Sequence, residues 1–187
     1  MRSLKAIVVT FMLLPFASVA QENSWVTVKD TDKGYRVDFP QEAKKGSQDV
    51  PTAKGVVVMH TYTITSTSLD AKNLLYMSSF SEYPSDFFPN GLDSEDAQND
   101  VLDGAVEGAV TNVKGKLIMN ESITFNGYPG RHIKIEVDQD ALYVLTMRNI
   151  LVDFKMYILQ TISLKGSSDN REAKKFFDSF ELINVKK

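Results

Sequence analysis

Apolar and polar residues alternate strictly between residues 131 and 137, and this is the clearest pattern in the chain. Ile133, Ile135 and Val137 are separated by single polar or charged residues. A period of two is typical of a β-strand with one face on a core and the other in water. The turn sequence Asn-Gly-Tyr-Pro-Gly at 126–130 precedes it and predicts a hairpin.

This strand belongs to a longer run, from Gly115 to Ser163, that predicts four consecutive antiparallel strands joined by short turns. The last two, from Ala141 to Val152 and from Met156 to Ser163, are apolar at most positions of both faces. Strands of that kind are central in a sheet and covered on both sides. We therefore expect other elements to pack against both faces of this sheet.

A helix is predicted from Leu92 to Val110. Asp93 or Ser94 can cap its first turn, and small or β-branched residues recur at four-residue spacing along one side. Gly104 and Gly108 weaken its interior, so packing must hold it in place.

A second helix is predicted near the end of the chain, after an N-cap at Ser167 or Ser168. The tail at 181–187 predicts a last short strand. The apolar face of this helix consists of Ala173, Phe176, Phe177 and Phe180.

The N-terminal half of the chain predicts several short strands, which are 24–28, 35–39, 55–66 and 74–83. Residues 41–54 are polar and predict a loop. Phe87 and Phe88 lie in a further loop, at 85–91, and are interpreted as plugs at the edge of a core.

The first twenty residues predict a signal peptide. Arg2 and Lys5 supply its positive start, residues 6–17 form an apolar run too short to span a bilayer, and Ser-Val-Ala at 18–20 fits a cleavage site. Residues 21–187 are then expected to form one domain that is periplasmic or secreted. An N-terminal membrane anchor is the alternative that stays open. The chain has no cysteine, which argues against a lipid-anchored lipoprotein.

The charge balance restricts the partners that we expect. Removing Arg2 and Lys5 from the 21 basic residues leaves 19, against 24 acidic ones, so the net charge is near −5. This argues against nucleic acid and against an anionic membrane surface as partners. The absence of cysteine also removes thiol catalysis and thiolate metal sites.

No constellation in the chain predicts catalysis, metal binding or a cofactor. There is no Gly-x-Ser-x-Gly motif and no glycine-rich phosphate loop, and the two histidines, His60 and His132, are too far apart in sequence to suggest a zinc site. His132 is interpreted as a solvated strand residue. A triad assembled in space by either histidine stays open. We expect a protein that is not an enzyme.

Three motifs resemble those of a known superfamily. They are Gly-Tyr-x-Val-x-Phe-Pro at 34–40, Gly-Tyr-Pro-Gly-Arg at 127–131 and Phe-Phe-Asp-Ser-Phe at 176–180. In this order the chain resembles the PsbP-like fold superfamily, which includes the DcrB-type exported bacterial envelope proteins. The resemblance implies an α+β fold in which helices pack on both faces of an antiparallel sheet. It also implies a non-catalytic accessory or partner-binding role.

Within that resemblance, Tyr128, Arg131 and His132 are the candidate partner-binding residues. Tyrosine and arginine are favoured anchors at protein interfaces. The competing interpretation is structural, with Tyr128 packed at the hairpin corner and Arg131 in a salt bridge.

Three functional hypotheses follow from the sequence. The first is an exported, non-catalytic binding or accessory protein of the bacterial cell envelope, with an unknown protein partner and no stable membrane anchor after signal cleavage. The second is a carrier of a small apolar or amphipathic ligand in a pocket between sheet and helix, with Phe87 and Phe88 at its mouth. The third is a hydrolase that uses His60 or His132.

Overall fold

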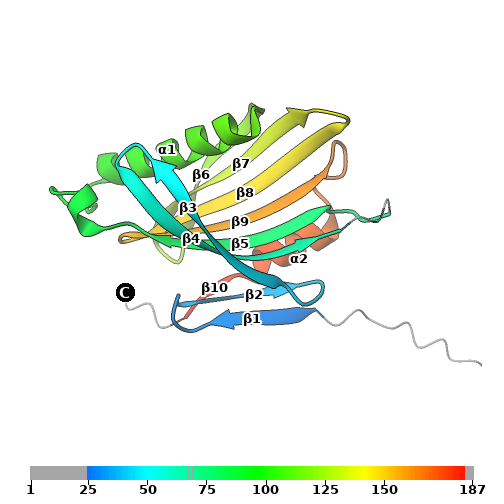
Figure 1. Ribbon diagram of the computed structural model, residues 1–187, viewed down its shortest axis with the longest axis horizontal. Helices are drawn as coiled ribbons and strands as arrows, with labels where there is room; N and C mark the ends of the chain where they lie inside the picture. The colour runs from blue at the N-terminus through cyan, green and yellow to red at the C-terminus, as the bar shows by residue number, and fades with distance from the viewer. Residues whose placement is uncertain (1–24, 67, 69, 184–187) are drawn as a thin grey trace, which may run out of the picture.

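The computed structural model describes residues 25–66, 68 and 70–183. The described part is built mainly from β-strands and contains two α-helices, α1 (Glu95–Val113) and α2 (Arg171–Asp178) (Figure 1). The α+β class predicted from the sequence is confirmed. The predicted signal peptide at residues 1–20 lies outside the described residues.

Seven antiparallel strands form the larger sheet. Its four strands at one side, β6, β7, β8 and β9, are the four consecutive strands predicted between Gly115 and Ser163, and β6 pairs with β7, β7 with β8 and β8 with β9. In spatial order the strands are β3 (Lys44–Thr52), β4 (Gly55–Thr65), β5 (Leu75–Glu82), β9 (Lys155–Leu164), β8 (Leu142–Val152), β7 (Tyr128–Asp138) and β6 (Lys116–Phe125).

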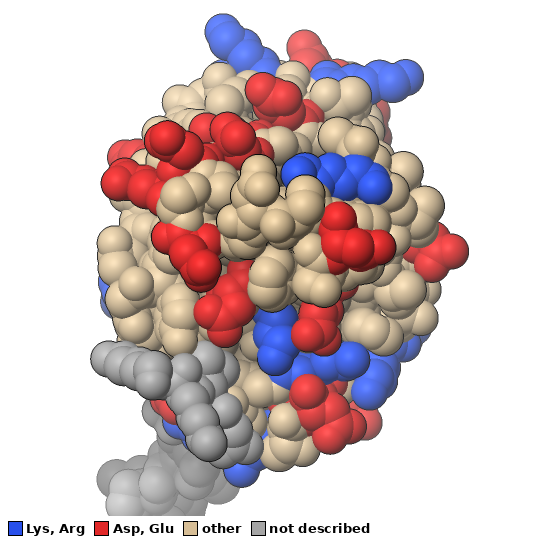
Figure 2. All heavy atoms as spheres, turned by 90° about the vertical axis from the view of Figure 1, so that its left-hand side faces the viewer, with Lys and Arg blue, Asp and Glu red and all other residues tan. Residues whose placement is uncertain are grey.

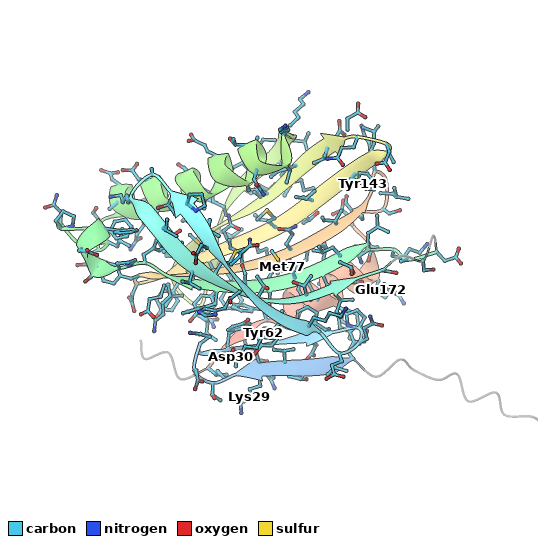
Figure 3. The ribbon with its side chains drawn as sticks, in the orientation of Figure 1. Lys29, Asp30, Tyr62, Met77, Tyr143 and Glu172 are labelled. Atoms are coloured by element: carbon cyan, nitrogen blue, oxygen red, sulfur yellow. The ribbon has the colours of Figure 1, made fainter. Side chains whose placement is uncertain are left out.

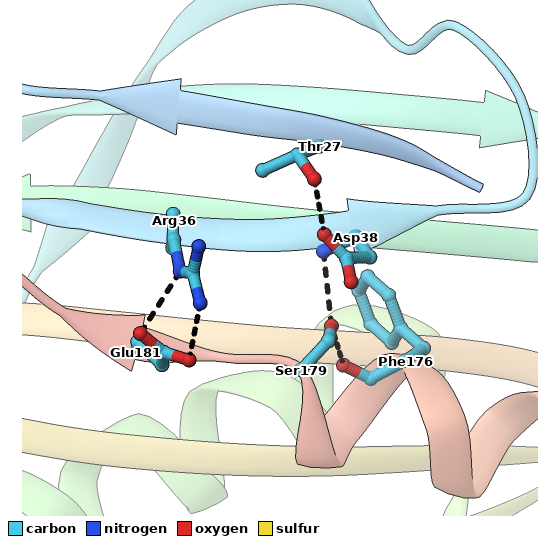
Figure 4. Close-up of polar contacts among 6 residues, drawn as sticks. All are labelled: Thr27, Arg36, Asp38, Phe176, Ser179 and Glu181. Atoms are coloured by element: carbon cyan, nitrogen blue, oxygen red, sulfur yellow. Dashed lines mark hydrogen bonds and ion pairs between the residues drawn. The ribbon is translucent and has the colours of Figure 1, made fainter.

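A smaller sheet contains β1 (Val26–Asp30), β2 (Tyr35–Phe39) and β10 (Glu181–Leu182). Figure 4 shows how it is joined to the end of α2. The guanidinium of Arg36 donates two hydrogen bonds to Glu181, and the Ser179 hydroxyl accepts one from the Asp38 amide. The chain termini of the described part are therefore held together in one sheet.

The polar segment predicted as a loop at 41–54 is largely a strand, so that prediction was wrong. β3 pairs with β4 over nine residues and forms one edge of the large sheet. Most of its side chains are exposed on both faces, so no apolar alternation marks it in the sequence. Pro51 is tolerated because an edge strand leaves one row of amides unpaired.

Two groups of core residues take alternate positions of β8. Ile150 and Val152 belong to a cluster that contains Phe176 and Phe177 of α2, with Phe39 of the small sheet. Leu145 and Met147 belong to a cluster with Val106 of α1 and Ile133 of β7. Most side chains of β8 and β9 are buried, which confirms that these are central strands.

The two helix starts were predicted with unequal success. Ser94 caps α1 as expected, because its hydroxyl accepts the Ala97 amide at 3.2 Å. The prediction for α2 was wrong, since Asn170 is its N-cap and accepts the Ala173 amide at 2.8 Å. The Asn170 side chain also exchanges hydrogen bonds with Asn73, a residue far away in sequence, and this tertiary contact orients the cap.

Candidate functional site

An open groove lies where α1 ends over the large sheet, and we call it the α1 groove. Its volume is about 630 Å3. In Figure 3, Met77 lies on the sheet below α1 and Tyr143 lies near the start of β8. The groove is lined by Leu74, Asn112, Val113, Lys114, Val137, Gln139, Tyr143, Leu145, Gln160 and Ile162.

Neighbouring strands supply the floor of the groove in rows. Leu145 of β8 lies opposite Ile162 of β9, and Val137 of β7 lies opposite Tyr143. The next row places Gln160 between two methionines, Met147 on β8 and Met77 on β5. Paired residues of an antiparallel sheet share a face, so these rows make a mostly aliphatic surface.

The groove exists because α1 is narrower than the sheet beneath it. The helix packs on β7 and β8, and β9 and β5 extend beyond it. Its last residues, Asn112 and Val113, form one wall. The chain then turns sharply at Gly115, where a Cβ would lie 2.5 Å from Cγ2 of Ile135 and 2.8 Å from the Glu136 carbonyl oxygen. This close approach holds the end of the helix against β7.

The groove lining also contains a few polar groups, two of which lie at the α1 C-terminus. Lys114 is the only formally charged residue among the ten that line the groove, and the amides of Asn112 and Gln139 lie in the same lining. The Tyr143 hydroxyl donates to Asp140 at 3.3 Å. Desolvation and Asp140 raise the pKa of Tyr143 above its ordinary value of 10.0.

The structure separates the three residues predicted to form a contact surface. Arg131 is only 8% exposed and donates to Asp103 at 3.0 Å and to Asn99 at 2.9 Å, both on α1. His132 points to the opposite face of β7, where its ring lies 6.3 Å from that of Phe177 on α2. Tyr128 is half-buried against the cluster around α2.

Arg131 therefore does not share a face with Tyr128 and His132. The salt bridge expected from the structural interpretation is present, with Asp103 as its partner. That Tyr128 and His132 contact a partner stays a prediction.

The environment of His132 leads to a prediction about pH. Burial and the neighbouring Arg148 lower the pKa of His132 below its ordinary value of 6.5. As the pH falls, His132 is therefore protonated at a higher pH in the unfolded chain than in the folded one. The free energy of unfolding should then fall as the pH drops below about 6.5. Urea denaturation between about pH 7.5 and 5 measures this dependence.

The variant His132→Gln should flatten that profile. An identical profile in wild type and His132→Gln would assign the pH dependence to other groups. Three further charged groups affect the pKa of His132. Lys134 lowers it, as Arg148 does, and the carboxylates of Glu121 and Asp169 raise it.

Neither histidine is joined to a hydrolytic arrangement in the described part of the chain. Among the hydrogen bonds found there, none links His60 or His132 to a serine or a carboxylate. His60 lies beside Phe80, with ring centroids 6.4 Å apart. Within residues 25–183, as far as they are described, no group of three or more histidines and carboxylates is placed to hold a metal ion.

Phe87 and Phe88 do not lie at the mouth of the α1 groove. Phe88 is buried and packs edge-on against Tyr83, at 5.8 Å between ring centroids. Phe87, at the end of the 3-10 helix η1 (Ser85–Phe87), lies so close to Gly55 that a Cβ there would be 2.5 Å from its ring. The interpretation as a plug at a core edge is confirmed for Phe88, and Phe87 is only partly buried.

Acidic side chains gather at the end of the molecule where α1 begins (Figure 2). Glu95 and Asp96 lie in its first turn, where negative charge is favourable next to the helix dipole. The exposed helix face continues with Asp100 and Glu107. This acidic surface is explained by the helix and does not extend the groove.

Sequence reasoning offered a pocket between sheet and helix as one hypothesis but missed the residues that line the groove, although two signals pointed to them. Gln160 is a polar residue with a long side chain in the middle of a central strand, and Tyr143 is the one aromatic residue in the groove lining. Both residues lie on the same sheet face as α1, which only the strand register reveals.

No helix in the described part of the chain combines the length and apolar character needed to cross a membrane.

Comparison with known proteins supports the fold. No family model and no curated protein matches the sequence. The structure is similar to the solution structure of cyanobacterial PsbP (CyanoP) from Synechocystis sp. PCC 6803, with a TM-score of 0.53 and 14% identity over 88% of this chain and 95% of that one. A protein of unknown function from Pseudomonas aeruginosa gives a TM-score of 0.37 and 11% identity over 77% of this chain and 85% of the other. The first of these similarities shows that the chain has a PsbP-like fold.

Proposed function

We propose that this protein is a non-catalytic binding protein of the bacterial cell envelope and that the α1 groove is its binding site. The observation that carries the proposal is the groove itself, an open volume of about 630 Å3 over a sheet face that α1 leaves uncovered. That volume lies within the range of about 300–1,000 Å3 typical of ligand sites. Its aliphatic floor with a few convergent polar groups is the composition expected of such a site.

Export to the periplasm or beyond is part of the proposal. It is supported by the charged, apolar and small-residue pattern of the first twenty residues. The resemblance to DcrB-type envelope proteins points to the same compartment. We also infer the layered arrangement of that fold, with one helix on each face of the large sheet, because α1 and α2 contact alternate residues of β8.

A binding role is supported over hydrolysis by the positions of the histidines. His132 lies between the sheet and Phe177, and His60 lies beside Phe80, so the groove receives neither of them. Among the residues that line it, the groups with polar hydrogens are Lys114, Tyr143 and three amides. These groups suit recognition by hydrogen bonds better than acid–base chemistry at neutral pH.

A matched pair of variants tests the proposal. Val113→Glu places a charge in the groove wall, and Ile118→Glu makes a similar change on β6, where Ile118 is 47% exposed at a β-bulge outside the groove. Protein purified from its own envelope, analysed by native mass spectrometry and by cross-linking, should carry a bound species. Val113→Glu should lose that species and Ile118→Glu should retain it.

Thermal unfolding of both variants controls for damage to the fold, because a glutamate in the last helical turn costs about 0.3–1 kcal/mol. A bound species retained equally by both folded variants would place binding elsewhere and contradict the proposal. A preparation with no bound protein or small molecule would also contradict it.

A further inference from the structure

We infer that the α1 groove binds an amphipathic anion with a single aliphatic chain, the chain along the sheet and the anionic group at Lys114. This inference rests on the proposed function and names the ligand class of the same site. It draws on three features of the groove, which are its aliphatic floor, its single charge and its open end.

The floor suits an aliphatic ligand better than an aromatic one. Tyr143 is the one aromatic residue of the lining, and the rest of the apolar surface comes from leucine, isoleucine and valine side chains. Met77 and Met147 extend it on either side of Gln160. Methionine and branched aliphatic side chains adapt to a flexible chain, and flat ligands prefer aromatic partners with which they can stack.

The direction of the ligand follows from the charge. Lys114 is the only charged residue of the lining and lies at the C-terminal end of α1, next to Asn112 and Val113. The C-terminal end of α1 carries partial negative charge, which favours a lysine there and weakens the attraction of Lys114 for an anion. Part of that partial charge is offset because the Thr111 carbonyl accepts the Lys114 amide and the Val110 carbonyl accepts the Gly115 amide. The nearby Asp140 carboxylate accepts the Tyr143 hydroxyl.

The floor also continues past the lining in the direction of the sheet end. Leu164 lies opposite Tyr143, on the same face, and is 43% exposed. An aliphatic chain longer than the groove can therefore remain on apolar surface. Because the groove is open on one side, it does not exclude head groups by size. The charge of Lys114 therefore has to select between anionic, neutral and cationic head groups.

Dodecanoate is the probe that tests this inference, with dodecyl maltoside and dodecyltrimethylammonium as the neutral and cationic comparators. All three are used below their critical micelle concentrations, with the full protein labelled at its methionine methyl groups. Dodecanoate should shift the NMR signals of Met77 and Met147 and leave Met119 on β6 unchanged. Calorimetry should give it the highest affinity of the three.

Lys114→Met should weaken dodecanoate binding about two- to five-fold, the range expected for an exposed ion pair of about 0.5–1 kcal/mol. Lys114→Met should not weaken the binding of dodecyl maltoside, which carries no charge. Lys116→Met, two residues further along the chain and outside the groove, should leave both affinities unchanged. Equal effects of the two lysine variants, or equal affinities for the neutral and anionic probes, would overturn the assignment of the anionic group.

The outcomes separate this inference from the proposed function. If no amphiphile binds but Val113→Glu still removes a captured protein, the ligand class is wrong and the groove remains a binding site. Association only with micelles, or shifts at Met119 equal to those at Met77, would show adsorption outside the groove and overturn the inference.

Discussion

Replacing Phe176 with alanine should lower the free energy of unfolding by about 3–5 kcal/mol, the usual cost of removing a buried aromatic side chain. Phe176 is 0% exposed. Its ring lies 5.2 Å from that of Phe39 in the small sheet and 5.4 Å from that of Tyr76 in the large sheet. The substitution would therefore leave a cavity at the point where α2 and both sheets meet.

Urea denaturation measures this loss, with Leu142→Ala as the control. Leu142 is 38% exposed at the start of β8, and its truncation should change stability by less than about 1 kcal/mol. A cost below about 1.5 kcal/mol for Phe176→Ala would mean that α2 is not anchored through this ring. Because α1 contributes to other core clusters, dodecanoate binding in the groove should survive in the folded fraction.

Gly130→Ala should destabilise the protein by about 1–3 kcal/mol, because the new methyl group meets backbone. A Cβ at Gly130 would lie 2.4 Å from the carbonyl oxygen of Asn149 on the neighbouring β8. Two strands that pair closely at this position cannot separate without losing ladder hydrogen bonds. Gly130, the second glycine of the Gly-Tyr-Pro-Gly-Arg motif, therefore serves the close pairing of β7 with β8, and the turn itself lies at 126–127.

Gly104→Ala is the matched control, and its effect on stability should have the opposite sign. Gly104 lies inside α1, where nothing lies within 4 Å of an added Cβ. Replacing a helical glycine with alanine there should stabilise the protein by about 0.5–1 kcal/mol. Thermal unfolding of the two variants compares them directly, and a neutral Gly130→Ala would show that β7 and β8 can separate at that point.

The position of Arg131 could have been predicted from the same alternation that identified β7. Arg131 is in phase with Ile133, Ile135 and Val137, which face α1 in the core. Its neighbour His132 is out of phase and faces the other side. A contact surface containing both was inconsistent with the period of the strand, and the ion pair to Asp103 satisfies the buried guanidinium instead.

The α1 groove, in contrast, was beyond the reach of local patterns. Its lining comes from α1, from β7, β8 and β9, and from the segments next to β5 and β7, so it depends on strand order and on the place where the helix stops. The end of α1 was expected at Val110, one turn before its actual end at Val113. That last turn supplies Asn112 and Val113, two residues of the groove wall.

The amino-acid sequence by itself determined the elements whose signals are local. The period of two in β7, the apolar strands β8 and β9 and the Ser94 cap all act between residues close together in the chain. The tertiary structure alone decided that the polar segment 44–52 is a strand, that Asn170 caps α2 and that a groove opens beside α1. Each of these depends on a partner distant in sequence, whether a neighbouring strand, the amide of Asn73 or the width of the sheet under a helix.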